Sequence, residues 1–277
     1  MKMLAGFVGL MTVLACTSVR AERVTEQKSW RQAYPVTSGQ PRLIVHNIWG
    51  NVRVRAGAEG EIVVSASERR SAQTTAAFEK SKEQLRLEVD ASPQGVSLIV
   101  THPERRDRMD VCQGCSLEYQ FDISVPPDAL IDVRTVTDGR VDVSGIRGPV
   151  TAGNVNGAVA VSGLDECSNI ESVNGTLEVV FERIPAGDCN LKTINGEITV
   201  GLPAGTGLEA ILDLGHGQIE SDFDVDAMTL PVKVEKSRQQ DHWRYRVQKS
   251  TGLRVGAGGP TFTFASLNGD VRILKNK

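Results

Sequence analysis

The sequence has little of what marks the commonest functional classes. Aromatic residues make up only 5% of its 277 residues, and the formal net charge is only −3. A nearly neutral chain has no general affinity for nucleic acid, so we expect no nucleic-acid partner. No set of nucleophile, base and orienting group stands out, and the four histidines are scattered along the chain. These absences argue against an enzyme, and we expect neither a cofactor nor a metal site.

The chain also lacks an apolar run long enough to cross a bilayer. The run at residues 3–15 is too short for a stable transmembrane helix, but it follows Lys2, as in an export signal. Residues 1–21 are therefore predicted to be a signal peptide with two competing ends. The sequence up to Cys16 resembles a bacterial lipobox, which would make Cys16 a lipidated N terminus, whereas the sequence before Glu22 resembles an ordinary cleavage site. A buried N-terminal helix is a third alternative.

Cysteine is scarce as well, at five residues. If Cys16 is removed or lipidated, four remain, and an even number in an exported protein suggests disulfides. Cys112 and Cys115 form a single Cys-Gln-Gly-Cys pair, which has too few ligands for zinc and lacks the βαβ context of a redox motif. A local disulfide between them is favoured over free thiols and over a metal or redox role.

Glycine is abundant, at 27 residues, and much of it is regularly spaced. Between residues 137 and 221 a short phrase recurs, in which an Asn-Gly or similar corner is followed by aliphatic residues two and four places later. The glycines follow one another at steps of 18, 18, 21 and 21 residues: Gly139, Gly157, Gly175, Gly196 and Gly217. The phrase returns near both ends of the chain, at Gly50 and at Gly269.

A fixed period of about 20 residues is typical of a chain built from one unit stacked on itself. Side chains alternate between the faces of a strand, so the aliphatic residues two places after the glycines share one face; they are Val141, Val159, Leu177, Ile198 and Ile219. At roughly 3.3 Å per residue, one unit forms a coil about 60 Å around, which fits three short faces. We predict an all-β, single-stranded β-solenoid (β-helix) whose coils of 18–21 residues stack about 4.8 Å apart. An antiparallel β-sandwich is the alternative.

The corners are expected to be structural rather than a ligand site. Glycine lacks Cβ and asparagine tolerates the left-handed region, so Asn-Gly supplies the positive φ angles of a sharp corner. The corner residues are Asn156, Gly157, Asn174, Gly175, Asn195, Gly196, Asn268 and Gly269. Cys167 and Cys189 precede two successive corners by nearly equal distances. We expect them about 5 Å apart on adjacent coils, within reach of a disulfide.

Three places after the corner glycines, carboxylates occur only in every second unit: Asp142, Ala160, Glu178, Thr199 and Glu220. This pattern is typical of a solvated face, because like charges on neighbouring strands destabilise a sheet. Glu178 and Glu220 would lie about 9.6 Å apart by strand spacing, near the upper limit for the carboxylates of a glycoside hydrolase. Neither a basic cluster nor an aromatic sugar platform accompanies them, so a carbohydrate-active enzyme is a minor hypothesis.

The rest of the chain suggests a lead-in and one domain. Residues 22–42 are polar and are predicted to be a linker or an extended lead-in. Residues 43–277 are predicted to form the β-strand repeat domain, with its core coils at residues 130–222. One short helix is expected at residues 71–84, where small apolar and charged residues fall on opposite faces. It would flank the β structure and cover an edge.

In their order, several segments resemble a bacterial family of exported β-strand repeat proteins that carries an adhesin label and is catalogued as a domain of unknown function. The resemblance covers roughly residues 43–274 and rests on Val-Pro-Pro at 125–127, the unit at 138–143, the Asn-Gly coils, and the segments at 202–205 and 258–271. It implies a β-solenoid-like fold and an exported location. The resemblance implies no catalytic residues in this chain. The four remaining cysteines and Gly215-His216-Gly217 depart from its pattern.

The favoured hypothesis is a non-catalytic, adhesin-like protein of the cell envelope that displays repeated β faces to a protein or a polysaccharide. We expect it in the periplasm, at the outer membrane or on the surface of a bacterium. It would touch the membrane only through a lipid anchor at Cys16. An accessory role in envelope-stress signalling is an alternative that rests on analogy with proteins of similar fold.

Overall fold

The structure is a computed structural model that describes residues 23–101, 114–185, 187–230, 233–239, 242–248 and 251–276. The predicted signal peptide, Cys16 and Cys112 lie outside the described residues. Within the described part of the chain, no helix is both long enough and apolar enough to cross a membrane.

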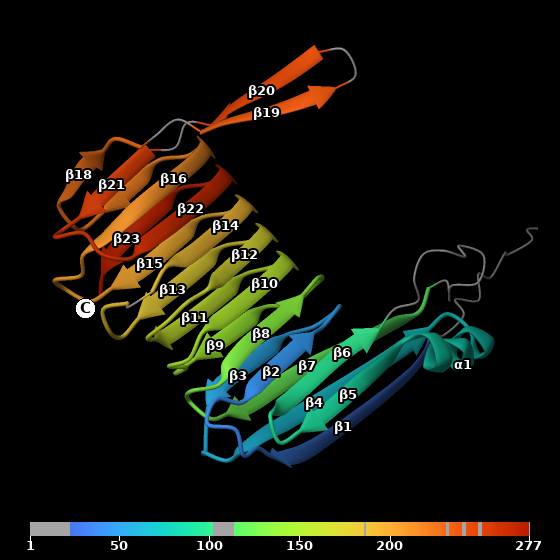
Figure 1. The fold of residues 1–277 in the computed structure, drawn as a ribbon. Coiled ribbons are helices and arrows are strands. Elements are labelled where there is room, and N and C mark those ends of the chain that lie inside the picture. Colours follow the sequence, from blue (N-terminus) through green and yellow to red (C-terminus); the bar gives the residue numbers. More distant parts are fainter. Residues whose placement is uncertain are drawn as a thin grey trace, which may run out of the picture.

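Nearly every described element is a β-strand, and two large sheets of mixed direction share one hydrophobic core (Figure 1). In spatial order, the ten-stranded sheet consists of β1 (Val24–Pro35), β4 (Glu61–Ala72), β7 (Ser116–Val125), β3 (Val52–Ala56), β9 (Val141–Ser144), β11 (Val159–Leu164), β13 (Leu177–Phe181), β15 (Ile198–Leu202), β23 (Val271–Lys275) and β17 (Ile219–Ser221).

The second sheet has eleven strands, which in spatial order are β18 (Val225–Met228), β21 (Thr251–Val255), β16 (Leu208–His216), β22 (Thr261–Asn268), β14 (Cys189–Asn195), β12 (Asn169–Asn174), β10 (Val150–Asn156), β8 (Leu130–Thr135), β2 (Arg42–His46), β6 (Gly95–Thr101) and β5 (Arg86–Ser92). A separate two-stranded hairpin, β19 (Lys233–Gln239) and β20 (His242–Gln248), projects from one end of the molecule (Figure 1).

Successive repeat units stack in parallel register, as the glycine spacing predicted. Val141 pairs with Val159, Val159 with Leu177, and Leu177 with Ile198, on β9, β11, β13 and β15. All four side chains are at most 1% exposed. Equivalent positions of neighbouring units therefore meet at strand spacing and form one aliphatic column inside the molecule. This pairing confirms the prediction on which the sequence-based fold depends.

The cross-section of each unit differs from the expected coil. A unit places one strand in each sheet and so has two faces rather than three; β10 and β11, for example, flank the corner at Gly157. The sheets are not closed, and the two-layered sandwich describes the architecture better than a single-stranded solenoid does. With two facing layers, the inward aliphatic residues of both sheets pack directly against each other across about 10 Å.

The sandwich alternative is in turn wrong about strand direction. The central strands of both sheets are parallel, as in the pairs β10–β12 and β11–β13. Antiparallel pairs occur toward the ends of the sheets, where β1 pairs with β4 and β5 with β6. Parallel pairing follows from the stacking itself, because each unit runs around the molecule in the same direction as the last.

The C-terminal copy of the phrase is inserted into the stack rather than added to its end. Strand β23 lies between β15 and β17, with Val271 level with Ile198 on one side and Ile219 on the other. Strand β22 is likewise inserted between β14 and β16. Its Phe262 and Phe264 are fully buried, and Phe262 contacts Phe181 with 5.5 Å between ring centroids. The order of units in space therefore differs from their order in the sequence.

The corner glycines are required because neighbouring corners approach closely. A Cβ atom on Gly175 would lie 2.0 Å from the carbonyl oxygen of Gly157, and one on Gly196 would lie 2.0 Å from that of Gly175. The expected positive φ is found at Gly157 (154°) and Gly269 (159°), whereas Gly175 and Gly196 do not have positive φ angles. Among described residues other than glycine, only Asp138 has a positive φ. At Gly175 and Gly196, the lack of space between stacked backbones, rather than a left-handed conformation, requires glycine.

The N-terminal part extends both sheets, and in the ten-stranded sheet its strands β1, β4 and β7 are long, with 12, 12 and 10 residues. The predicted lead-in contains β1, which pairs along its whole length with β4. Helix α1 (Thr75–Gln84) begins later than expected, because β4 continues to Ala72 and Thr74 caps the helix, its side chain accepting a hydrogen bond from Ala77 N–H at 3.1 Å. Buried Arg70 fastens the helix to the sheet by donating to the carbonyl oxygens of Ser81 and Leu85, at 2.7 and 3.0 Å.

Substituting alanine for Gly175 should destabilise the stack, because the added Cβ meets a backbone oxygen that cannot move without separating two strands. We expect a loss of about 1–3 kcal/mol or more in the free energy of unfolding, measured by chemical denaturation. Gly39→Ala is the matched control, because a Cβ on Gly39 meets no atom within 4 Å. Equal stability of the two variants would contradict the steric role of the corner glycine.

Cys167 and Cys189 are disulfide-bonded, with 5.3 Å between their Cα atoms, as their positions before two successive corners predicted. The bond closes a loop with a sequence separation of 22 residues. Replacing both cysteines with serine should cost about 2–4 kcal/mol, because the unfolded chain loses this constraint. Chemical denaturation with and without reductant measures the effect. Reductant should lower the free energy of unfolding of the native protein by this amount, whereas the double variant has no Cys167–Cys189 bond to lose.

Candidate binding surface

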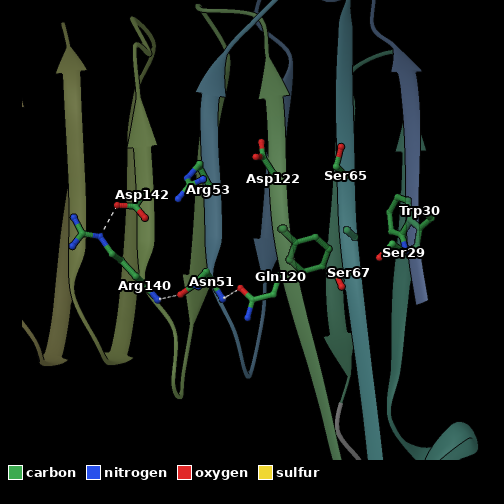
Figure 2. Close-up of a pocket in the computed structure, with 12 residues that line it drawn as sticks. Ser29, Trp30, Asn51, Arg53, Ser65, Ser67, Gln120, Asp122, Arg140 and Asp142 are labelled. Carbon is green, nitrogen blue, oxygen red and sulfur yellow. Dashed lines mark hydrogen bonds and ion pairs between the residues drawn. The ribbon is translucent and has the colours of Figure 1, made fainter. Parts of the chain in front are cut away.

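A groove crosses the strands on the outward face of the ten-stranded sheet. Two adjoining depressions, of about 510 and 530 Å³, share Arg53, Arg140 and Asp142 and together reach from β1 to β13. Figure 2 shows the first of them, with polar side chains on neighbouring strands. Six strand spacings of about 4.8 Å give the groove a length of about 29 Å.

Hydrogen bonds fix one wall of the groove. The Asn51 backbone N–H donates to Gln120 Oε1 at 3.0 Å, and the Arg140 backbone N–H donates to Asn51 Oδ1 at 2.7 Å (Figure 2). Arg140 Nε donates in turn to Asp142 Oδ1 at 2.6 Å. Side chains from three neighbouring segments are thus oriented before any ligand arrives, which lowers the entropy cost of binding.

Arg53 lies near the middle of the groove and forms no ion pair with its neighbours. It is level with Asp122 on β7 and with Asp142 on β9. Asp122 is paired with Arg55 at 3.0 Å, however, and Asp142 with Arg140. No hydrogen bond or ion pair of Arg53 occurs among the described residues. Its five N–H donors are therefore available at an exposed, central position.

The second depression exists because small side chains stand on its floor. Ala160 on β11 stands between Asp142 and Glu178, and Ser144 and Ser162 line the same depression beside it. Glu178 forms no ion pair with any described residue. The groove therefore continues from a cationic centre at Arg53 to an unpaired carboxylate on β13.

The expected distance of about 9.6 Å between Glu178 and Glu220 is wrong. Because β23 is inserted, these residues lie three strands apart, in the series Glu178, Thr199, Arg272 and Glu220. Three spacings amount to about 14 Å, beyond the 9.5 Å that a pair of glycosidase carboxylates spans. Arg272 also donates to Glu220 at 2.9 Å, and this bond, together with the charge of Glu197, raises the pKa of Arg272.

The corner asparagines form a hydrogen-bonded ladder on the exposed edge of the stack. Asn174 Nδ2 donates to Asn156 Oδ1 at 2.8 Å, Asn195 to Asn174 at 2.7 Å, and Asn268 to Asn195 at 2.8 Å. Each amide thus joins two units that are neighbours in space. This arrangement engages the side chains with one another and agrees with a structural role.

A row of buried donors beside the ladder was missed from the sequence. Two places before each Asn-Gly corner stands a small polar residue that donates to the carbonyl oxygen of the neighbouring corner glycine, at 2.8–3.4 Å: Asn154 to Gly139, Ser172 to Gly157, Thr193 to Gly175 and Ser266 to Gly196. All four donors are at most 4% exposed. The signal was present in these four units as a polar residue followed by an aliphatic residue, Asn and Gly.

Cys115 belongs to the last of the expected sites, the Cys112–Cys115 pair, and is not part of a cluster of metal-binding side chains among the described residues. Cys115 is disulfide-bonded, and its sulfur lies 3.3 Å from the carbonyl oxygen of Ala77 in α1, while Cys112 is outside the described residues. In the described ranges, no three His, Cys, Asp or Glu side chains gather so that they could hold a metal ion.

Comparisons with known proteins show only distant similarity. No protein-family model matches the chain, and no curated protein matches it. Three solved structures each align with 90% of this chain: a candidate cell adhesion protein from Clostridium sporogenes (TM-score 0.43, 10% identity, 100% of its length), a candidate adhesin from Bacteroides fragilis (0.38, 12%, 97%) and one from Parabacteroides distasonis (0.27, 8%, 97%). With TM-scores below 0.5, these similarities support no conclusion about this chain.

Replacing Asn195 with aspartate should weaken the asparagine ladder, because a carboxylate cannot donate to Asn174 and adds an uncompensated charge. We expect a loss of about 1–2 kcal/mol at neutral pH. The loss should shrink below about pH 4, where the carboxyl group is protonated and can donate again. Asn190→Asp, an exposed position on the same strand, is the control for charge alone, and thermal unfolding at both pH values distinguishes the two.

Proposed function

We propose that this protein is a non-catalytic binding module of the bacterial cell envelope. Its binding surface would be the groove on the ten-stranded sheet, and its ligand an extended polysaccharide. The observation that carries this proposal is a pre-oriented polar groove, about 29 Å long, with Arg53 unpaired near its middle.

The chemistry of the groove favours a polysaccharide over a protein. Hydroxyl, amide, carboxylate and guanidinium groups from Ser65, Ser67, Gln120, Asp122 and Arg53 line it, and such groups exchange hydrogen bonds with sugar hydroxyls. None of the large exposed hydrophobic residues in the described ranges lines the groove. Protein interfaces, in contrast, have an apolar core rich in aromatic residues. Trp30 borders the groove but packs against the hydrophobic core.

A binding role is also favoured over hydrolysis. The carboxylates that come nearest to a hydrolytic pair in the sequence, Glu178 and Glu220, are about 14 Å apart by strand spacing, and Arg272 engages Glu220. We place the protein outside the cytoplasm on the basis of its predicted export signal and its disulfide between Cys167 and Cys189.

The test is a glycan array followed by calorimetric titration of the polysaccharide that is retained. Arg53→Ala should weaken binding about 10-fold or more, because hydrogen bonds to a charged group contribute about 1.5–3 kcal/mol. The same variant should change stability by less than about 0.5 kcal/mol, since Arg53 has no partner to lose among the described residues.

Arg86→Ala on β5 of the other sheet is the matched control and should bind as the native protein does. Retention of no polysaccharide, or equal binding by the Arg53 variant, would contradict the proposed site. Shortening of the bound polysaccharide would contradict the non-catalytic assignment.

A further inference from the structure

A column of exposed aliphatic residues runs across the outward face of the eleven-stranded sheet. In four units that are adjacent in space, one aliphatic residue stands directly before the Asn-Gly corner: Val155, Val173, Ile194 and Leu267. Val136 takes the same place at the end of the next strand, β8, because Thr135 before it is level with Asn154. Four of these five residues have exposed fractions of 36–52%, and they account for more than half of the seven large exposed hydrophobic residues in the described ranges. We call this row the aliphatic column.

The residues of the aliphatic column face solvent, so packing in the hydrophobic core does not explain why they are aliphatic. Valine and isoleucine favour strands wherever they lie, but leucine does not share this preference, and threonine, which does, is absent from the column. The adjacent outward row on the same strands varies freely, with Arg134, Gly153, Glu171 and Lys192. A water-facing row that keeps one chemical class across five adjacent strands marks a surface for apolar contact.

The aliphatic column forms one side of a groove of about 320 Å³. The other side is the row from Arg134 to Lys192, on strands β8, β10, β12 and β14, which lie side by side in Figure 1. Gly153 deepens this groove, because it contributes no side chain between Arg134 and Glu171. The site lies on the opposite layer from the polar groove and is independent of the function proposed above.

The dimensions of the aliphatic column exclude a protein partner, a second copy of the chain and an extended peptide as its ligand. It is one side chain wide, and four strand spacings make it about 19 Å long. Five side chains that are at most about half exposed cannot supply the roughly 800 Å² per partner that a stable protein interface or a dimer buries. An extended peptide presents side chains on one face every 6.7 Å or so, which does not match rungs about 4.8 Å apart. A linear hydrocarbon chain has no such period to match.

The charged side chains beside the groove indicate which head group a bound hydrocarbon chain would carry. Arg134 is paired with Asp132 at 3.2 Å and with Glu171 at 3.6 Å. Lys192, at the other end of the groove, makes no ion pair with a described residue, and its next neighbour in the row is Ala265. A free cation beside an apolar groove fits an anionic head group.

We propose that this groove binds a long-chain fatty acid, with its hydrocarbon chain along the aliphatic column and its carboxylate on Lys192. Binding is non-covalent and leaves both partners unchanged. The hydrocarbon chain lies across the strands, so each added methylene group extends the contact toward the next unit.

Calorimetric titration of the mature protein with dodecanoate, below its micelle concentration, tests the proposal. Dodecanoate should bind about 4-fold more tightly than decanoate, because each of two methylene groups, when half buried, contributes about a factor of two. Dodecyltrimethylammonium, which has the opposite charge, should bind more weakly. Lys192→Gln should weaken dodecanoate binding about 2- to 5-fold at low salt, and Lys192→Arg should not.

Gly153→Val is the decisive variant. A Cβ at Gly153 would meet Glu171 Cγ at 3.5 Å, Arg134 Cγ at 3.6 Å and Glu171 Oε1 at 3.8 Å, which are ordinary contacts with flexible side chains, so the strand accepts valine while the groove is filled. Dodecanoate binding should fall at least about 10-fold, with the melting temperature unchanged. Val89→Ser on β5, an exposed aliphatic position outside the column, is the control and should leave binding unchanged.

Several results would overturn the proposal. These are no dodecanoate binding, equal binding by the Gly153→Val variant, or capture of the protein only by anionic phospholipid vesicles. Self-association that Ile194→Ser abolishes would assign the aliphatic column to a second copy of this chain instead.

Discussion

The fold depends on the close approach of one backbone corner to the next. The carbonyl oxygen of Gly157 has the Gly175 backbone against it, with no space for a Cβ atom, and accepts a hydrogen bond from buried Ser172. The same contact recurs along the stack, so each unit's distance from its neighbour and its strand register are both fixed. Once the corners are in register, the inward aliphatic residues must form columns, and so must the outward residues.

The parallel stack and its columns could be predicted because their signals are local. Alternation after each glycine shows which residues point inward, and the regular steps show that equivalent residues of successive units meet. The pairing of Val141 with Val159, and the disulfide between Cys167 and Cys189, follow from these two facts alone. Neither requires knowledge of how the ends of the chain are arranged.

The order of units in space could not be obtained from spacing, because the phrases at Gly217 and Gly269 are nearly interchangeable by pattern. Their difference is chemical. The unit after Gly217 has Ser221 where others have a second aliphatic residue, whereas the C-terminal unit has both Val271 and Ile273. The complete unit takes the inner position, where both residues are fully buried, and the incomplete one is left at the edge of the sheet. The polar groove was missed for a related reason, since Arg53 and Asp122 come from distant segments that only the long N-terminal strands bring together.

The same constraint explains why each layer offers a linear surface. A stack with one repeat along its axis turns any outward position into a row about 4.8 Å in pitch. On the ten-stranded sheet the rows are polar, with paired charges around Arg53; on the eleven-stranded sheet one row is aliphatic across five adjacent strands. A compact ligand would contact two or three rungs of such a row, whereas a chain molecule lying across the strands contacts all of them. The geometry of the stack therefore favours linear ligands on both faces, and side-chain chemistry decides which kind each face can hold.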